Sequence, residues 1–386
     1  MNSETGASGH LVIGGGLAGS MAALRLAAAG GEVTLLEKEC GAHHKVCGEF
    51  LSSEAVAYLR AAGVDPVELG AETIRVVRLS VKQTVVEAAL PFTALSLSRF
   101  ALDEALLACA QAGGCNVVRG VFVERLWKHR SQWHAQVRNG GAWRSPAVLL
   151  ATGKHDIGGW ERRGGVQGGL VGFKLHWRLA PAQTAALRNA MELFLFAGGY
   201  GGLSLIENNT ANLCLVVRRE RLRRLGGWPE LLAFLREGNR HLDDRLQGAA
   251  PLWNRPLAVF PIPYGFLSSS ADGLWRLGDQ AAVIPSFTGD GMSIALHSGA
   301  LAAQMALDGK VAGEYQKELK GHLRRSMALS TRLSQAMVSS AGRAAAPLAL
   351  SLLPAALGWI ARTTRIPQRL LAAEPAKLAS MGAPSL

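Results

Sequence analysis

The sequence contains few cysteines, and none of them forms a C-x-x-C pair. The five cysteines are spread over 386 residues without regular spacing, so we expect neither a disulfide framework nor a metal site. The first ten residues are polar and lack the apolar stretch of a secretory signal. Together these two absences predict a protein of the reducing cytoplasm.

Charged residues are also scarce, at 18% of the chain, whereas hydrophobic residues make up 49%. This composition excludes disorder and predicts a folded chain of two or three domains. The net charge is +12, with local clusters at Arg218–Arg224 and Arg324-Arg325, but no basic tract is interleaved with aromatic residues. The absence of such a tract argues against nucleic-acid binding. The positive net charge suits an anionic membrane surface, or a negatively charged substrate or carrier.

Long apolar runs are rare, and only residues 344–361 approach the length of a membrane span. Pro347 and Pro354 interrupt this stretch, and no second span accompanies it. We interpret it first as a buried or substrate-lining helical hairpin, second as a site of peripheral membrane contact, and third as a true span. The basic and apolar C-terminal region is thus where contact with a membrane or a carrier protein is expected.

What the chain does have is a strand–glycine–helix–strand pattern near its start. Leu11–Ile13 is typical of a buried strand, and a helix-forming run follows over residues 17–29. Val33–Leu36 is typical of a second strand, and it ends in Glu37. The glycines between the first strand and the helix follow the order G-x-G-x-x-G, at Gly14, Gly16 and Gly19.

Each part of this pattern serves the binding of a dinucleotide. Gly14 permits a tight turn, Gly16 lets the backbone approach a pyrophosphate, and Gly19 lets helix and strand pack closely. The free N–H groups at the N-terminus of the helix attract the phosphates. Glu37 follows Gly19 by 18 residues, where an acid can accept hydrogen bonds from the adenosine ribose. The pattern therefore predicts a dinucleotide site.

Three separated segments together resemble one enzyme superfamily. They are V-I-G-G-G-L-A-G-S with Glu37, S-R-F-x-L-D at Ser98–Asp103, and the glycine-rich Trp275–Met292. Their order and spacing are similar to the FAD-dependent superfamily of aromatic-ring monooxygenases, flavin halogenases and geranylgeranyl reductases. C-G-E-F-L-S at Cys47–Ser52 and G-Y-G-G-L at 199–203 are most similar to the geranylgeranyl-reductase-like branch. The resemblance implies bound FAD, with NAD(P)H as the reductant.

The third segment offers several groups to a flavin. The carboxylate of Asp279, after a strand and a glycine, can accept a hydrogen bond from a ribityl hydroxyl. Pro285 fixes the loop, and Gly289 and Gly291 let the backbone approach an isoalloxazine ring. The helix that follows presents its positive end to that ring, which favours the anionic reduced flavin. The residues concerned are Gly278, Asp279, Pro285, Gly289, Gly291 and Met292.

The resemblance also implies roles for residues elsewhere in the chain. Arg99 opens a helix, where a cation is unfavourable; it either contacts the ribityl–pyrophosphate region or is a surface charge. Cys47 lies on a loop beside the flavin in relatives, as a proton donor or as a residue that lines the site. Glu49 is an acid/base or anchors that loop, and Tyr200 faces the ring or belongs to the core. Further cofactor contacts are implied for Lys38, Lys45 and Val123.

We expect an α/β fold, with a discontinuous Rossmann-like FAD-binding domain, an inserted α+β substrate domain and a helical C-terminal region. The first part of the FAD-binding domain is expected at residues 1–155, with a small β insertion near 70–95. The substrate domain, with a mixed sheet, is expected at 156–267, the second part of the FAD-binding domain at 268–312, and the helical region at 313–386.

Three functions remain open at this point. The favoured one is a monooxygenase of secondary metabolism that hydroxylates a lipophilic aromatic, polyketide-like or quinol substrate through a C4a-hydroperoxyflavin. The alternative is a reductase or dehydrogenase acting on C=C bonds of a lipophilic substrate. A non-catalytic flavin-binding protein is a third class, against which the intact glycines argue. Alternating aromatic residues, which belong to the core or to a substrate pocket, are Phe173, Trp177, Phe194 and Phe196.

Overall fold

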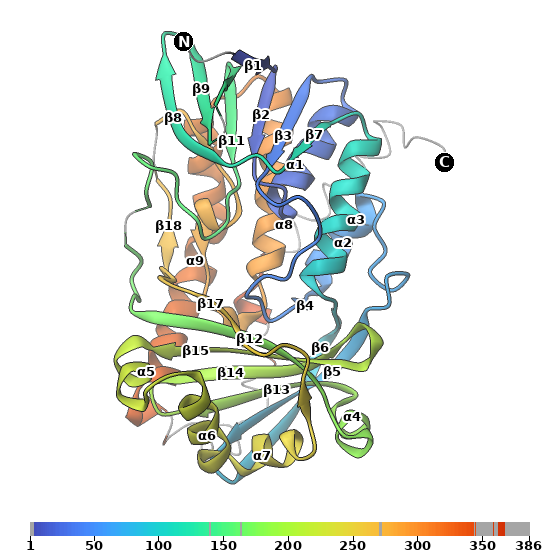
Figure 1. Ribbon diagram of the computed structural model, residues 1–386, viewed down its shortest axis with the longest axis vertical. Coiled ribbons are helices and arrows are strands. Elements are labelled where there is room, and N and C mark those ends of the chain that lie inside the picture. The colour runs from blue at the N-terminus through green and yellow to red at the C-terminus, as the bar shows by residue number, and fades with distance from the viewer. Residues whose placement is uncertain are drawn as a thin grey trace.

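The computed structural model describes residues 4–138, 140–162, 164–269, 272–342, 344, 358 and 362–366. Its upper half is built on a five-stranded parallel sheet of order β19-β11-β2-β3-β7 (Figure 1). The strands are β2 (His10–Ile13), β3 (Val33–Glu37), β7 (Asn116–Arg119), β11 (Ala147–Leu150) and β19 (Trp275–Arg276). The apolar runs of β2, β3, β11 and β19 are buried, as parallel sheets require, while the edge strand β7 is only partly covered. The α/β fold expected from the sequence is therefore confirmed.

Helices cover one face of this sheet. Helix α1 (Leu17–Ala28) packs against α3 (Arg99–Ala112) and α8 (Gly291–Leu307), and α2 (Ser53–Ala61) packs against α8. A Cβ atom at Gly299 would lie 2.2 Å from the carbonyl oxygen of Ala18, so glycine lets the backbones of α1 and α8 touch. Helix α9 (Ala312–Val338) packs on α8 and extends to the second half of the molecule.

A four-stranded sheet, of order β1-β10-β9-β8, packs on the parallel sheet through a cluster that contains the buried Trp133. Its strands are β1 (Glu4–Ala7), β8 (Val123–His129), β9 (Gln132–Val137) and β10 (Ala142–Ser145). A short ribbon, β18 (Phe266–Leu267) and β20 (Ala282–Val283), lies near the 3-10 turns η2 (Gly278–Gln280) and η3 (Ser286–Thr288).

The lower half is a nine-stranded sheet of order β16-β12-β15-β14-β13-β5-β6-β4, with β17 beside β12 (Figure 1). The bounds in the first part of the chain are β4 (Phe50–Leu51), β5 (Glu72–Val81) and β6 (Thr84–Ser96). The others are β12 (Leu170–Arg178), β13 (Asn189–Phe196), β14 (Gly199–Ile206), β15 (Thr210–Arg218), β16 (Ala250–Pro251) and β17 (Leu257–Val259), with η1 (Glu207–Asn209) before β15. The strands that we expected as an insertion near 70–95 are β5 and β6, and β5 pairs in parallel with β13 of this sheet.

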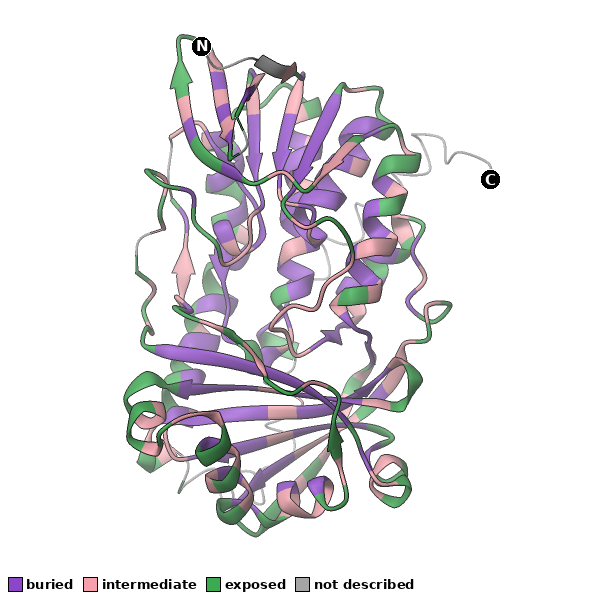
Figure 2. Cartoon of the chain, viewed as in Figure 1, coloured by how far each residue is buried: buried purple, intermediate pink, exposed green. Residues whose placement is uncertain are grey.

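Four helices cover the outer face of the nine-stranded sheet, and their outward sides are exposed (Figure 2). They are α4 (Pro181–Leu187), α5 (Arg219–Leu225), α6 (Trp228–Gly238) and α7 (Arg240–Leu246). The alternating aromatic residues of β12 and β13 are buried in one cluster with Leu231 and Leu235 of α6 and Leu242 of α7. These aromatics therefore belong to the core of the lower half.

Within the described residues, no helix combines the length and the apolar character that crossing a bilayer requires. The uncharged segment 344–361 lies outside the described residues apart from positions 344 and 358.

Candidate functional site

A cavity of about 820 Å³ lies between the two halves of the molecule. Its upper wall consists of the loops at the carboxyl ends of the parallel strands, where α/β sheets form their ligand crevices. Its lower wall is the inner face of the nine-stranded sheet. Of the predicted residues, those that line the cavity are Gly14, Gly16, Glu37, Lys38, Lys45, Cys47, Glu49, Arg99, Val123, Tyr200, Gly278, Asp279, Gly289, Gly291 and Met292. Gly19 and Pro285 lie in the adjoining elements and do not line it.

The three glycines of the first turn meet different surroundings. Gly14 has a φ of 108°, and a Cβ atom there would lie 2.4 Å from the carbonyl oxygen of Ala151. A Cβ atom at Gly19 would lie 2.0 Å from the carbonyl oxygen of Gly14. Gly16 instead has room, and its Cβ atom would lie 3.5 Å from Arg99 Nη2 and 3.6 Å from Lys45 Nζ. Gly14 and Gly19 thus shape the turn, while Gly16 faces two cations at the N-terminus of α1.

These two cations are held by one carboxylate. Arg99 donates to Asp103 over 2.6 and 2.8 Å, and Lys45 donates to the same carboxylate over 2.7 Å. Burial alone would raise the pKa of Asp103, but the charges of Arg99 and Lys45 keep that pKa below its usual value. The group carries one net positive charge beside Gly16, which suits a diphosphate.

Two acids lie at the carboxyl ends of strands of the parallel sheet, Glu37 at the end of β3 and Asp279 after β19, with β2 and β11 between these strands. Glu37 accepts hydrogen bonds from the N–H groups of Gly15 (2.6 Å) and Glu39 (3.0 Å), and a carboxylate has further lone pairs for ribose hydroxyls. Asp279 accepts from Lys154 Nζ over 2.9 Å. Burial alone would raise the pKa of Asp279, but the charge of Lys154 lowers it, so the carboxylate is ionised. Sequence reasoning missed Lys154, although its position just after the strand β11 was a usable signal.

The N-terminus of α8 is part of the upper wall of the cavity. Gly289 has a φ of 74°, and a Cβ atom there would lie 2.4 Å from the ring of Phe50, so only glycine fits this turn. Among the described residues, no atom lies within 4 Å of the Cβ position at Gly291, where the helix begins. Gly291 and Met292 line the cavity, so the first turn of α8, whose N–H groups have no partner within the helix, borders the cavity.

A buried polar cluster supports the loop of Cys47. The Glu49 side chain accepts a hydrogen bond from the backbone N–H of Arg99 at 2.8 Å and lies 3.0 Å from His176 Nε2. Its third partner is the ammonium group of Lys174, and neither side chain of this ion pair is exposed. Glu49 itself has a φ of 58°, in the left-handed region. Three donors thus hold one carboxylate in a strained part of the backbone.

The electrostatics of this cluster favour an ionised Glu49. Burial alone would raise the pKa of Glu49, but the hydrogen bond from His176 and the charge of Lys174 bring it below its usual value. With its acceptors occupied, Glu49 fits the loop-anchoring alternative better than the acid/base one. Lys174 and His176 lie two residues apart on one face of β12. Two buried polar residues at that spacing, in a strand that is apolar up to Lys174, were the signal that sequence reasoning missed.

His44 adds a third potential ligand to this cluster. Atoms of His44, Glu49 and His176 that could bind a metal lie within 4.8 Å of one another. The buried ammonium of Lys174 repels a cation at this point, and burial followed by the charge of Lys174 lowers the pKa of His44 to about 4. His44 packs in an aromatic cluster, with ring centroids 4.7 Å from Trp253 and 5.0 Å from His176. We therefore interpret the cluster as an anchor for the loop and assign no metal to it.

Cys47 and Tyr200 both line the cavity. The Sγ of Cys47 accepts a hydrogen bond from the N–H of Glu49 over 3.3 Å, which directs it along its loop. Tyr200 extends from β14, and Ser286 Oγ donates to its hydroxyl over 3.4 Å. Burial raises the pKa of Tyr200, so its hydroxyl is neutral. Burial also raises the pKa of the nearby Cys214 thiol to about 12, which leaves it protonated.

Comparison with known proteins gives a consistent result. Residues 9–142 match a family model described as FAD binding domain. A geranylgeranyl bacteriochlorophyll reductase-like protein from Thermoplasma acidophilum superposes with a TM-score of 0.72 at 17% identity, covering 97% of this chain and 99% of that chain. A triple mutant of the flavin-dependent brominase Bmp2 gives a TM-score of 0.74 at 16% identity, covering 97% and 98%.

A mutant of the halogenase PltM, solved in complex with FAD, gives a TM-score of 0.72 at 13% identity, covering 96% of this chain and 86% of that chain. No curated protein matches the sequence. These structures confirm the fold class drawn from the sequence, and the match over residues 9–142 supports an FAD-binding domain in the first third of the chain.

Proposed function

We propose that this chain, which has the fold of the FAD-dependent oxidoreductase superfamily and carries its FAD-binding domain, is a monooxygenase that hydroxylates a lipophilic ring substrate. One observation carries the proposal. A single cavity of about 820 Å³ is bounded by the dinucleotide turns on one side and by an apolar sheet face on the other. Cofactor and substrate can therefore meet in one space that protein surrounds.

The residues of the upper wall fit FAD. The turn at Gly16, with Lys45 and Arg99 beside it, suits the pyrophosphate. Glu37 suits the adenosine ribose, and Asp279 suits the ribityl chain. The free N–H groups of α8 then face the flavin ring. When bound, FAD supplies the electrons for the reaction, and we propose NAD(P)H as their source.

The lower wall supports a lipophilic substrate. Most of its lining comes from apolar side chains of the nine-stranded sheet and of α9, which favour a molecule with little polar surface. These side chains also exclude water from the space next to the flavin position, which favours transfer of oxygen to the substrate over loss to solvent. They include Val77, Leu79, Met191, Leu193, Leu195, Leu215, Val216, Leu333 and Met337.

A second function, reduction or dehydrogenation of a C=C bond, is favoured by one observation. Cys47 lies in the cavity on the loop that runs beside the flavin position, and its thiol could protonate a substrate carbon. Glu49 would keep this loop in place, through Lys174 and the N–H of Arg99. Tyr200, on β14, would bound the substrate in either reaction.

The first experiment tests the cofactor site. Purified protein should contain close to one FAD per chain by absorbance. Gly16→Val should remain folded by circular dichroism but lose its flavin, because its side chain would occupy the space beside Arg99 and Lys45. Gly41→Val is the matched control, because no atom of the described part of the chain lies within 4 Å of its Cβ position and it does not line the cavity. Full flavin content in Gly16→Val would contradict the assignment.

The second experiment separates the reactions. The holoenzyme is mixed with NAD(P)H and a panel of lipophilic phenols, quinols and alkenes, and oxygen uptake and products are measured. Oxygen uptake matched by hydroxylated product supports the monooxygenase. A saturated product without oxygen uptake supports the reductase. Yellow protein that neither accepts electrons from NAD(P)H nor transforms a substrate would identify a non-catalytic flavin-binding protein and refute both.

A further inference from the structure

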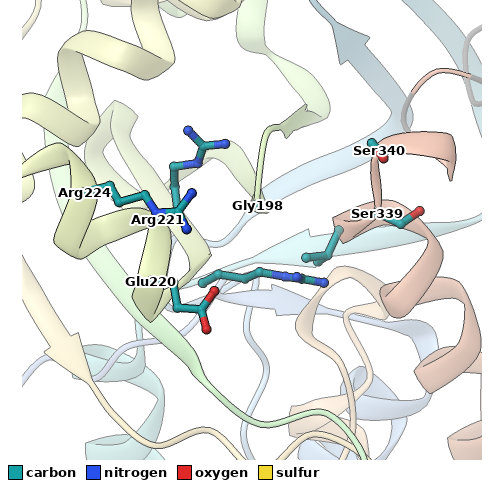
Figure 3. A pocket seen from close by; sticks show the side chains of 8 residues that line it. Gly198, Glu220, Arg221, Arg224, Ser339 and Ser340 are labelled. Atoms are coloured by element: carbon teal, nitrogen blue, oxygen red, sulfur yellow. The ribbon is translucent and has the colours of Figure 1, made fainter.

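A second hollow, of about 370 Å³, lies next to the cavity. Figure 3 shows Arg221 and Arg224 of α5 on one side of it, with Ser339 and Ser340, which follow α9, on the other. Arg218, the last residue of β15, completes the lining together with Gly198 and Glu220. We call this hollow the arginine pocket.

The arginine pocket is rich in uncompensated positive charge. Within the described part of the chain, Arg218, Arg221 and Arg224 form no ion pair, and Glu220 is the acid that shares the lining. Three guanidinium groups and one carboxylate give a formal charge of +2. Elsewhere, arginines such as Arg245 are bound by a buried acid, over 3.0 Å to Glu192. Guanidinium groups without a carboxylate partner, gathered around a hollow, are suited to an anionic ligand.

The pocket has a defined geometry. The N–H of Arg218 donates to the carbonyl of Gly198 over 2.8 Å, which closes the turn before β14. A Cβ atom at Gly198 would lie 3.3 Å from Arg221 Cβ and 3.7 Å from Arg221 Nε. The glycine therefore lets the Arg221 side chain lie across the turn, and Arg221 is half-buried there.

Two elements, β15 and α9, contribute residues to both hollows. On β15, Val216 lines the large cavity and Arg218 lines the arginine pocket. Residues two apart on a strand lie on the same face, about 7 Å from each other. On α9, Met337 lines the large cavity and the next residue, Val338, lines the arginine pocket. Arg218 thus lies at the end of β15 on the cavity side, and α5, which packs on the other face of the sheet, adds Arg221 and Arg224 at the edge, so the arginine pocket lies beside the apolar cavity at this edge of the sheet.

We propose that the arginine pocket binds a dianionic phosphate at one end of the substrate whose lipophilic part occupies the cavity. This inference rests on the proposed function, because it specifies the substrate of the same site. The net charge of +2 matches a phosphate monoester. The class of substrate is therefore an amphipathic molecule, apolar along the sheet and phosphorylated at its end.

The test measures binding of simple probes to the holoenzyme by calorimetry, without turnover. Decyl phosphate should bind at least about tenfold more tightly than decanol, the gain expected of a charge-assisted hydrogen-bonded contact. Arg218→Gln and Arg221→Gln should each weaken decyl phosphate about fivefold or more and leave decanol unchanged. Arg223→Gln is the matched control, because Arg223 is exposed on the same helix and does not line the pocket.

Further probes make the outcomes decisive. Equal affinity for decanoate and decyl phosphate would refute the proposal that the pocket selects a dianionic phosphate. Inorganic phosphate that binds as tightly as decyl phosphate would overturn the link between the two hollows. Loss of decyl phosphate binding in Arg223→Gln to the same extent as in Arg221→Gln would overturn the pocket itself. Because these measurements need no electron transfer, a failed pocket and a failed oxidoreductase assignment give different results.

Discussion

Replacing Lys174 by methionine tests whether the buried cluster fixes the loop of Cys47. Lys174 and Glu49 are fully buried and paired, and methionine fills most of the volume of a lysine stem. Removing one partner of a buried ion pair leaves an unpaired charge and costs about 3–5 kcal/mol. We therefore expect Lys174→Met to lower the free energy of unfolding by about 3 kcal/mol or more, in urea titrations at pH 7.5.

The pH dependence follows from the pKa of Glu49. Since that pKa is lowered in the folded state, the wild-type contribution is present above the pKa of the unfolded chain and is lost as the pH falls through the folded value. In Lys174→Met the carboxyl group loses its closest cation, so its pKa rises. The loss of stability should therefore be larger at pH 8 than at pH 5, because protonation removes the unpaired charge in acid.

A double variant completes the test. Glu49→Gln combined with Lys174→Met removes both charges, so its loss should be smaller than the sum of the two single losses by at least about 1.5 kcal/mol. Lys310→Met is the control, because Lys310 and Glu314 form an exposed pair at 3.7 Å that contributes at most about 0.5 kcal/mol. A loss below about 1 kcal/mol in Lys174→Met, or strict additivity at both pH values, would refute the anchoring role.

Three further predictions concern the upper wall. Asp279→Asn should raise the dissociation constant of FAD about tenfold, by loss of a charge-assisted contact, while unfolding in urea is nearly unchanged; an unchanged constant in flavin titrations would remove Asp279 from the site. Gly289→Ala should lower the unfolding temperature, because its φ of 74° and the Phe50 ring 2.4 Å from a Cβ atom oppose any side chain; thermal melts that match the wild type would contradict this geometry. Burial raises the pKa of Asp290, the residue before α8, to about 7, so stability falls as the pH rises from the unfolded value of about 4 to about 7, and the gain of Asp290→Asn over the wild type should be larger at pH 8 than at pH 5; equal urea midpoints at pH 8 would contradict it.

The sequence predicted the dinucleotide turn of the upper half well, because the residues that form this turn lie close together in the chain. A strand, a glycine turn and a helix follow one another within about thirty residues, and their periodicity and glycine spacing are visible without any long-range contact. The same holds for Ser98, which caps α3 as its position before a helical run predicts. The loop around Gly289 could be interpreted for the same reason, since its turn depends on glycines within the loop itself.

The lower half depends on pairing between distant segments. Strand β5 joins β13 over more than one hundred residues of chain, and no pattern within residues 70–95 shows which sheet they enter. The partners of Glu49 show the same limit: Lys174 and His176 lie on β12, and only the packing of that strand against the loop brings them to the carboxylate.

The arginine pocket depends both on a local sequence pattern and on packing between distant segments. The sequence by itself contains the cluster at Arg218–Arg224, because charge composition is local. Only the tertiary structure places that cluster beside the end of α9 and next to an apolar cavity. The physical reason is that backbone propensity and glycine geometry act between near neighbours, whereas burial, ion pairing and cavities arise where segments far apart in the chain exclude water from one another.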